Sequence, residues 1–202
     1  MTSTADIDLT NQALRMLGEF GVSSFDEGTD LAESCNRIVP TTLRAMLTAY
    51  PWRFTMRKAM LAQVAEAPLT EWTYQHAMPP EQIFIRSVRP GPRADPADEW
   101  EIFENRILSH HAILYCDYQV EIDSAAWPAW FTNLARNALA ADLAIAVGAG
   151  TTAADAFYRR TFGSPMENGS GGLMRVARNL DSQQQTPQRI GHTPLLTARW
   201  GR

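Results

Sequence analysis

Cysteine and lysine are both scarce in this chain of 202 residues. The two cysteines, Cys35 and Cys116, fall within apolar patterns and are too few for a disulfide scaffold, so we expect free thiols and a reducing compartment. The only lysine is Lys58, and it does not follow a glycine. A phosphate-binding loop that ends in Gly-Lys is therefore excluded.

Long apolar runs are missing as well. The longest, residues 138–149, is too short to span a bilayer and contains Asp142. Asp6 and Asp8 stand near the start without a basic run or an apolar segment after them, which is not the pattern of a signal peptide. We therefore expect a soluble protein with no membrane partner.

No group of residues has the spacing of a catalytic or metal site. His110 and His111 are neighbours, and neighbours in a strand point to opposite faces, so a turn is the better interpretation than a metal site. Three carboxylates between residues 117 and 123 are expected on the wet face of one strand. The run 168–172 lacks the first glycine of a nucleophile elbow and is interpreted as a linker. The sequence predicts no enzyme, no catalytic or metal site and no cofactor.

The net charge of −4 is unevenly distributed. Residues 1–155 contain 11 basic and 20 acidic side chains, whereas residues 156–202 contain 7 and 2, and residues 182–202 contain no acid. Arginine accounts for all the basic residues except Lys58; its planar contacts suit protein interfaces, and a genomic base-composition bias would give the same count. We expect the cationic C-terminal quarter to bind an acidic protein surface.

Apolar residues spaced by threes and fours predict helices in the first quarter of the chain. One helix covers residues 5–17 and ends at Gly18, in the left-handed conformation common at helix ends. A second helix begins with Asp30 as its N-cap, is kinked or divided at Pro40, and ends before Pro51.

Between residues 56 and 122 the apolar period changes to two, which predicts strands. Residues 112–122 show the cleanest alternation and place Gln119 on a mostly wet face. Residues 82–88 predict another strand, and a hairpin is expected to turn at Glu104-Asn105, because Asn tolerates the positive φ that such turns need.

Helices are predicted again after residue 122. One begins at Asp123 or Ser124, and its many alanines allow another helix to pack closely against it. Residues 163–172 are rich in Gly and Ser and are predicted to be flexible. Residues 182–202 have no sustained period and would need a partner to become ordered.

Together these patterns predict an α+β fold. Residues 1–55 and 123–180 form a bundle of about four helices, residues 56–122 form an inserted antiparallel β-meander, and residues 181–202 form an extended tail. The predicted core residues are large and apolar or aromatic: Leu47, Tyr50, Trp52, Phe54, Trp127 and Phe131.

Four segments make the chain resemble the phage tail tubular protein A family, whose members are adaptors that join a portal to a tail. The segments are Ala13-Leu14-Arg15-Met16-Leu17-Gly18, the helix that leads to Tyr50-Pro51-Trp52-Arg53-Phe54, the region 100–118 with Glu104-Asn105-Arg106-Ile107-Leu108, and the helix from Trp127-Pro128 through Phe131 and Leu139. They cover residues 5–147. The chain departs from the family at residues 163–172, since family members commonly continue their last helix straight into the tail.

The resemblance implies a virion structural protein without catalytic activity. Such a protein is a head-to-tail connector, a homo-oligomeric ring of about twelve copies between the portal protein and a tail nozzle, stopper or other tail protein. DNA passes through the bore without sequence-specific binding, and the ring lies in the neck of a virion that is assembled in the host cytoplasm. An acidic or neutral bore would avoid holding DNA phosphates.

This hypothesis assigns contacts to two parts of the chain. The C-terminal part is expected to dock on the portal, and the proline-rich tip after residue 88 is expected to face the tail. The portal contacts are Arg175, Arg178, Arg189, Leu195, Leu196, Arg199 and Trp200; the tail-side contacts are Arg89, Pro90, Arg93 and Asp95.

Two other classes of function stay open. A nucleic-acid-binding accessory protein would use the cationic quarter, although that quarter lacks the interleaved aromatics of a single-strand binder. An enzyme with a scattered site is the other alternative, and the sequence nominates no residue for it.

Overall fold

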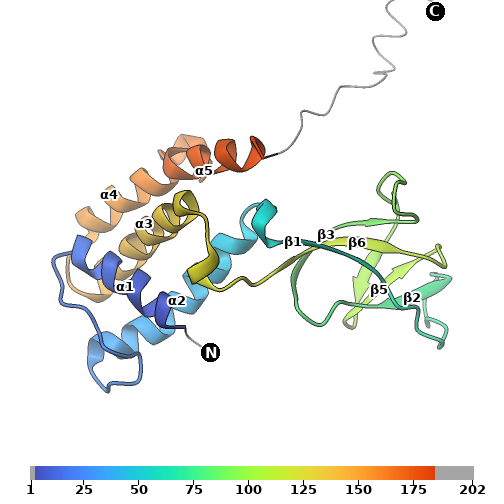
Figure 1. Cartoon of the computed structure of the whole chain (residues 1–202), viewed down its shortest axis with the longest axis horizontal. Helices are drawn as coiled ribbons and strands as arrows, with labels where there is room; N and C mark the ends of the chain where they lie inside the picture. The colour runs from blue at the N-terminus through green and yellow to red at the C-terminus, as the bar shows by residue number, and fades with distance from the viewer. Residues whose placement is uncertain (1–2, 185–202) are drawn as a thin grey trace, which may run out of the picture.

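The computed structural model describes residues 3–184, which form a helical unit and a β unit joined end to end (Figure 1). The helical unit is discontinuous in sequence, because the β unit is inserted between its second and third helices. The α-helices are α1 (Thr4–Met16), α2 (Asp30–Thr48), α3 (Ala129–Ala146), α4 (Thr151–Phe162) and α5 (Gly172–Ser182). The strands are β1 (Met56–Met60), β2 (Tyr74–Ala77), β3 (Gln82–Arg89), β4 (Glu101–Phe103), β5 (Arg106–Ser109) and β6 (Tyr115–Val120).

The predicted α+β class is confirmed, and two details of the prediction are corrected. The described residues contain five α-helices instead of about four. The strands do not form one meander, since they divide into two antiparallel sheets with the orders β1-β6-β3 and β2-β5-β4. Consecutive strands were assumed to pair, whereas β6 pairs with two strands that are distant in sequence.

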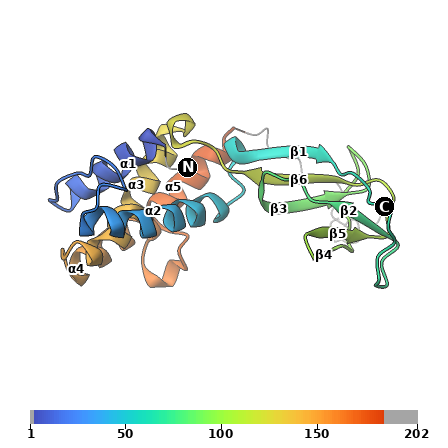
Figure 2. The same cartoon turned by 90° about the horizontal axis from the view of Figure 1, so that it is seen from below.

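Helix α3 is the central element of the helical unit and packs against α1, α2, α4 and α5. Its alanines Ala135, Ala138 and Ala140 are buried, and such small side chains let neighbouring helices approach closely. Figure 2 shows α1 and α4 on opposite sides of the unit, with α2 and α3 between them. The large buried cluster of this unit therefore forms around α3.

The helix ends agree with the sequence patterns in most details. Gly18 has a φ of 86°, as predicted for the residue after α1. The N-cap of α2 is Thr29, whose hydroxyl accepts from the Ala32 amide at 3.2 Å, so the prediction of Asp30 is wrong by one residue. Pro40 does not divide α2, which is continuous from Asp30 to Thr48.

The predicted hairpin at Glu104-Asn105 is confirmed. Both residues have positive φ, 46° and 60°, and they connect β4 to β5. The expected strand 112–122 is shorter than predicted, since β6 covers Tyr115–Val120. In place of a helix start at residue 123 or 124, Asp123 caps a 3-10 turn, η2 (Ser124–Ala126), and α3 begins after Pro128.

The glycine-rich segment 163–172 is not the flexible linker that its composition predicts. Its chain folds around Glu167, which accepts from the Ser164 amide at 2.8 Å and pairs with Arg175. A Cβ on Gly163 would lie 2.3 Å from the Glu167 carboxylate, and one on Gly171 would lie 2.4 Å from it. These glycines allow a close approach of two chain segments, which composition alone does not distinguish from flexibility.

Candidate assembly surfaces

The two units meet where α2 ends, and side chains of the β unit satisfy the free carbonyls of that helix. The Gln119 amide nitrogen, from β6, lies 3.0 Å from the Leu47 carbonyl and 2.9 Å from the Tyr50 carbonyl. Arg86, from β3, donates to the Thr48 carbonyl at 2.6 Å. The last carbonyls of a helix have no partner within it, so these side chains replace water there. We call this contact the joint.

Gln119 and Arg86 also bind each other within the joint. The Arg86 Nε donates to the Gln119 Oε1 at 2.6 Å, and Gln119 is fully buried. Burial lowers the pKa of Arg86, but a positive charge at the negative end of the helix dipole is favourable. The Gln119 prediction is therefore wrong: this residue faces the helical unit, which covers Gln119 on the side of β6 that was expected to be wet.

Helix α5 reaches the same place from the other end of the chain. The Asp181 carboxylate is buried and accepts from the Arg53 amide at 2.9 Å, just before β1. Burial raises the pKa of Asp181, while the bond from Arg53 opposes that shift. Arg178 lies over the Tyr50 ring, 5.3 Å from its centre. The C-terminal end of α5 is thus fixed to the connection between the two units.

The six predicted core residues gather beside the joint. Leu47, Trp52 and Phe131 are fully buried, Trp127 is nearly so, and Tyr50 and Phe54 are partly buried against the same cluster. The Trp52 indole also donates to the Met46 carbonyl at 2.9 Å, which adds another cap to α2. The rings pack mostly edge to face, with Phe131 in the middle.

The residues predicted to contact the portal divide into two groups. Arg175 and Arg178 lie on α5, where Arg175 pairs with Glu167 and Arg178 donates to the Ser170 hydroxyl at 2.9 Å. Both arginines therefore help to hold the segment 163–172. The other five lie outside the described residues: Arg189, Leu195, Leu196, Arg199 and Trp200.

The residues predicted to face the tail lie at the end of β3 and in the turn after it. Arg89 pairs with Asp117 at 2.6 Å, and Lys58 approaches the same carboxylate at 3.3 Å. Asp117 is consequently an ion-paired residue, which corrects its interpretation as a solvated carboxylate. Pro90 is partly buried, whereas Arg93 and Asp95 are exposed.

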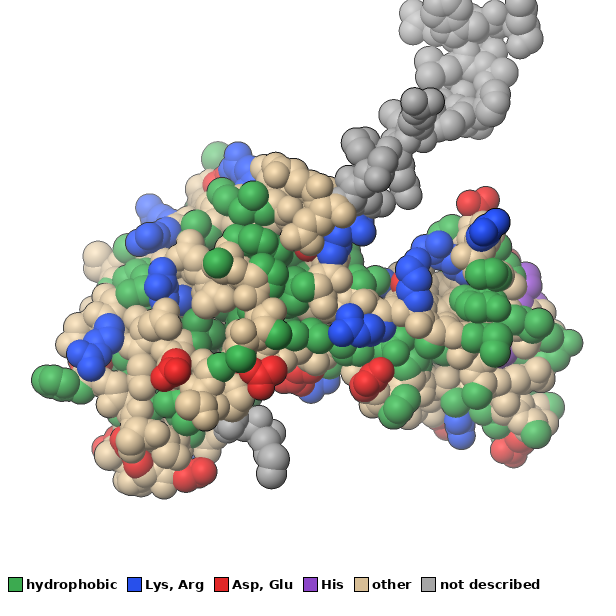
Figure 3. Space-filling model, viewed as in Figure 1, with side chains coloured by type: hydrophobic (Ala, Val, Ile, Leu, Met, Phe, Trp, Pro, Cys, Tyr) green, Lys and Arg blue, Asp and Glu red, His purple; other side chains and the backbone are tan. Residues whose placement is uncertain are grey.

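Large apolar side chains are exposed on both units. On the β unit, Leu69 is fully exposed, and Ile102 and Phe103 on the edge strand β4 are about half exposed. Figure 3 shows such side chains over the β unit, while the arginines of the helical unit are scattered in separate places on that face. Apolar residues gathered at one end of a protein commonly mark a docking surface.

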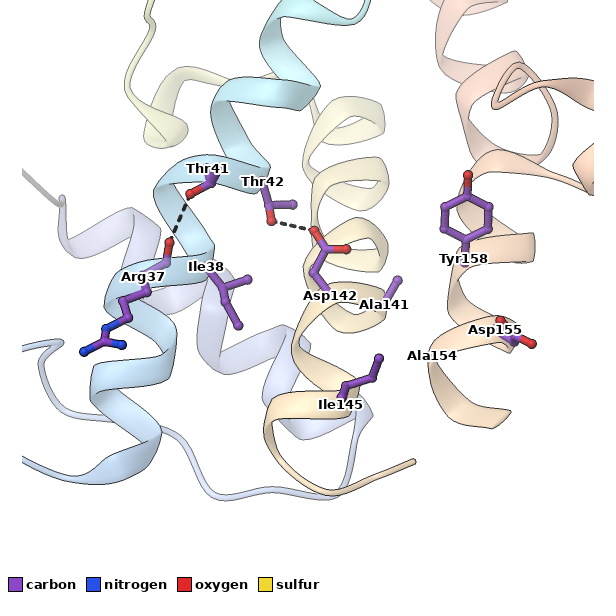
Figure 4. Close-up of a pocket in the computed structure, with 10 residues that line it drawn as sticks. All are labelled: Arg37, Ile38, Thr41, Thr42, Ala141, Asp142, Ile145, Ala154, Asp155 and Tyr158. Atoms are coloured by element: carbon purple, nitrogen blue, oxygen red, sulfur yellow. Dashed lines mark hydrogen bonds between the residues drawn. The ribbon is translucent and has the colours of Figure 1, made fainter. Parts of the chain in front are cut away.

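A groove crosses the helical unit between α2 and α4, with α3 as its floor (Figure 4). Its volume is about 530 Å³. Ile145 on α3 and Tyr158 on α4 line it and are 65% and 48% exposed, which is high for large apolar side chains. Asp142 lines it too, and its carboxylate accepts from the Thr42 hydroxyl at 2.5 Å. The groove exists because no helix covers α3 between α2 and α4.

The β unit contains a buried histidine, His76 on β2. Its Nε2 lies 3.0 Å from the His111 carbonyl, whereas its Nδ1 is buried without a hydrogen-bond partner in the described part of the chain. Burial lowers the pKa of His76. Among residues 3–184, no three His, Cys, Asp or Glu side chains gather as metal ligands would.

Sequence reasoning missed the joint and the groove for different reasons. Gln119 and Arg86 are polar residues on strands, and only the position of α2 shows which face is covered. Ile145 fits the apolar period of its helix, which does not reveal that the face is open. For Phe20 the sequence does contain a signal: an aromatic residue between Gly18 and Gly21, in a predicted turn, indicates an exposed apolar side chain.

No protein-family model matches this chain, and no curated protein is similar enough in sequence to count as a match. Within residues 3–184, no helix has both the length and the apolar character needed to cross a membrane.

Proposed function

We propose that this protein is a head-to-tail connector of a phage particle. About twelve copies form a ring between the portal and the tail, and DNA passes through the bore without sequence-specific binding. The proposal starts from the resemblance to the tail tubular protein A family. It is an assembly function, in which surfaces and rigid geometry matter more than a reactive group.

The joint is the observation that carries the proposal. A subunit that contacts a portal at one end and a tail protein at the other must keep a fixed angle between its two binding regions. Gln119 and Arg86 bind the end of α2, and Asp181 binds the Arg53 amide in the connection. Bonds from three separate parts of the chain support a subunit that transmits position between its ends.

The β unit supplies the tail-side surface in this proposal. Leu69, Ile102 and Phe103 expose apolar area on the β unit, and β4 is an edge strand of its sheet. Edge strands offer unpaired backbone groups to a partner. A tail protein that covers these residues would bury area that is costly to leave in water.

The C-terminal residues supply the portal-side contact. They follow α5, which Asp181 fixes at the joint, and residues 182–202 contain four cationic or ionisable basic groups and no acid. A cationic segment that leaves a fixed point suits an acidic surface nearby. Because Asp181 fixes α5 at the joint, the C-terminal segment would start from a constant position relative to both units.

The test is to delete residues 183–202 and to examine the particles by electron microscopy. We expect DNA-filled heads without tails, because the subunit no longer binds the portal. The matched control replaces the same residues by a Gly/Ser sequence of equal length, and it should fail in the same way. Normal tailed particles from the deletion would remove the C-terminal segment from the proposal.

A direct binding experiment tests the ring. Negative-stain images of purified portal mixed with this protein should show an added ring, while light scattering should find the protein alone to be monomeric when dilute. A portal that stays bare would contradict the connector function.

Residues 156–202 contain seven basic and only two acidic side chains. This excess of positive charge favours one alternative, a nucleic-acid-binding accessory protein. Binding of duplex DNA that weakens steeply with salt would support this alternative. The scattered arginines on the face in Figure 3 favour the connector, since a nucleic-acid interface gathers its cations in one stripe.

A further inference from the structure

We propose that copies of this chain join head to tail through Phe20, which inserts into the groove between α2 and α4 of the next copy. The inference rests on the proposed ring and names the contact between its subunits. Two surfaces carry it: a loop that holds an aromatic ring out in solvent, and a groove whose apolar floor is uncovered.

Phe20 is 82% exposed, and the chain on its N-terminal side is fixed. Helix α1 ends in a Schellman motif, in which the Gly18 amide donates to the Arg15 carbonyl at 3.2 Å and the Glu19 amide donates to the Leu14 carbonyl at 3.0 Å. This closing pattern sets the direction in which the chain leaves a helix. Phe20 therefore follows a defined turn.

The chain on the C-terminal side of Phe20 is fixed by Asn11 of α1. The Asn11 side chain donates to the Val22 carbonyl at 2.9 Å and accepts from the Val22 amide at 2.8 Å. A Cβ on Gly21 would lie 2.7 Å from the Asn11 Oδ1, so only glycine allows this approach. Val22 itself is buried. With the chain held on both sides, the Phe20 side chain lies in solvent, and its apolar surface is available to a partner.

Hydrogen bonds also fix the rest of the loop, from Ser23 to the start of α2. Glu27 accepts from the Ser23 hydroxyl at 2.6 Å, from the Ser23 amide at 2.8 Å and from the Thr29 hydroxyl at 2.9 Å. These bonds lower the pKa of Glu27 to about 2. The loop is consequently ordered and negatively charged at neutral pH.

Charge and position make the loop and the α4 side of the groove complementary. Residues 18–30 contain four acids and no basic residue. Arg37, Asp142 and Asp155 line the groove, and Arg37 pairs with Glu33 of its own helix, so Arg37 does not contribute to this complementarity. The cations that suit the loop are the exposed Arg159 and Arg160, which follow Tyr158 on α4. The acidic loop of one copy would face these arginines when Phe20 contacts Ile145.

The loop starts from α1, whereas the groove lies beside α4, and Figure 2 shows these helices on opposite sides of the unit. A contact between two different surfaces is heterologous and leaves each copy with one free loop and one free groove. Such contacts continue from copy to copy until a ring closes. A two-fold dimer would need one surface to contact itself.

A disulfide experiment tests the contact in the full chain. In the double variant with Phe20→Cys and Ile145→Cys, oxidised glutathione should produce a ladder of cross-linked multimers on a gel, and a reducing agent should collapse it. The native thiols Cys35 and Cys116 are buried and do not interfere. The control combines Phe20→Cys with Val176→Cys, whose position on α5 is 51% exposed and lies outside the groove.

We expect at least about tenfold more multimer from the Phe20–Ile145 pair than from the control, both in the free protein and in the mixture with portal. Equal amounts in both samples would overturn the inference. A ladder that disappears when residues 183–202 are deleted would also overturn it, because the C-terminal segment, and not the contact of Phe20 with the groove, would then hold the copies together.

A mixing experiment gives a second, independent readout. Phe20→Glu removes the inserted ring, and Ile145→Glu blocks the groove with a charge of the same sign, so neither variant should self-associate. At a protein concentration high enough for the wild type to associate, a mixture of the two should form dimers and nothing larger, because each pair has one intact contact. Larger assemblies from the mixture would contradict a single head-to-tail contact.

Failure of the contact can be told apart from failure of the connector function. Rings on the portal without the Phe20–Ile145 cross-link would keep the function and remove the contact. A specific ladder from a chain that never binds a portal would keep the contact and remove the function.

Discussion

Within residues 3–184, the core of the helical unit contains 22 buried hydrophobic residues, whereas the core of the β unit contains eight. The β unit is also divided into two small sheets, so its few buried residues are shared between them. Burial of a large aliphatic side chain contributes about 1.5–3 kcal/mol, so the larger core contributes more to stability than the smaller one.

The smaller unit depends on its connection to the larger one. Below about 70–80 residues, a single core rarely supplies more than about 3–5 kcal/mol. The β unit lies within that range of length, and the joint adds bonds from Gln119 and Arg86 to the end of α2. We infer that the joint stabilises mainly the β unit. The following predictions test this asymmetry, and hydrogen exchange measured by mass spectrometry can follow both units separately.

The largest effect is expected for Phe131→Ala. Phe131 is fully buried, and its ring lies 5.2 Å from Trp52 and 4.9 Å from both Phe54 and Trp127. Truncation should lower the free energy of unfolding by about 3–5 kcal/mol and should raise exchange in both units, because the β unit rests on the helical one. The control is Phe103→Ala at a half-exposed position, with little change expected. A helical unit that exchanges as in the wild type would contradict this role.

Leu114→Ala should destabilise the β unit without destabilising the helical unit. Leu114 is fully buried in the small core, and the loss should be about 2–5 kcal/mol. We expect faster exchange throughout the β unit, while the helical unit stays protected. The adjacent Ile113→Ala, at an exposed position, is the matched control. Equal loss of protection in the helical unit would show that the units unfold together and would break the comparison.

Gln119→Leu tests the joint itself. The change keeps the approximate size of the side chain but leaves the Leu47 carbonyl and the Arg86 Nε without their partner, at a cost of about 1–3 kcal/mol. The Tyr50 carbonyl keeps its bond from the Trp52 amide. Denaturant unfolding should divide into two transitions, with the β unit first. Gln75→Leu is the control, since its amide bonds only the Glu66 carbonyl at an exposed site. A single transition at the wild-type midpoint would contradict the stabilising role of the joint.

The smallest effect is expected from pH. The folded pKa of His76 lies below its unfolded value near 6.5, so the unfolded chain binds the proton more readily. This contribution to stability is therefore constant above pH 6.5 and falls as the pH is lowered beneath it, by at most about 1.4 kcal/mol per pH unit. Exchange in the β unit should rise at pH 5.5, and His76→Gln should remove that part of the dependence. Exchange that is slower at pH 5.5, after correction for intrinsic rates, would contradict the sign.

Local signals predicted much of this fold because they act over a few residues. Gly18 ends a helix and Glu104-Asn105 turns a hairpin through their own backbone preferences, and both predictions are confirmed. The strand order was not predictable in the same way. Alternation of apolar residues in β6 indicates a strand, but it does not say that β1 and β3 flank it.

The residues of the candidate surfaces were hidden because their meaning depends on distant partners. Gln119 has a polar side chain on a strand, and only the end of α2 makes it a buried cap. Gly163 and Gly171 have the composition of a linker, yet the Glu167 side chain occupies the space that a Cβ would need. Ile145 shows the reverse case: its place in the apolar period of α3 suggests burial, but the side chain is exposed because no element covers it.

The insertion of the β unit between α2 and α3 has a consequence for synthesis on the ribosome. Helices α1 and α2 emerge first, but the residues that cover their apolar faces belong to α3, which is made after the whole insertion. The nascent chain therefore carries an unprotected hydrophobic surface for more than seventy residues of elongation. Early truncation products of this gene should be bound by chaperones, and release should follow once α3 has left the exit tunnel.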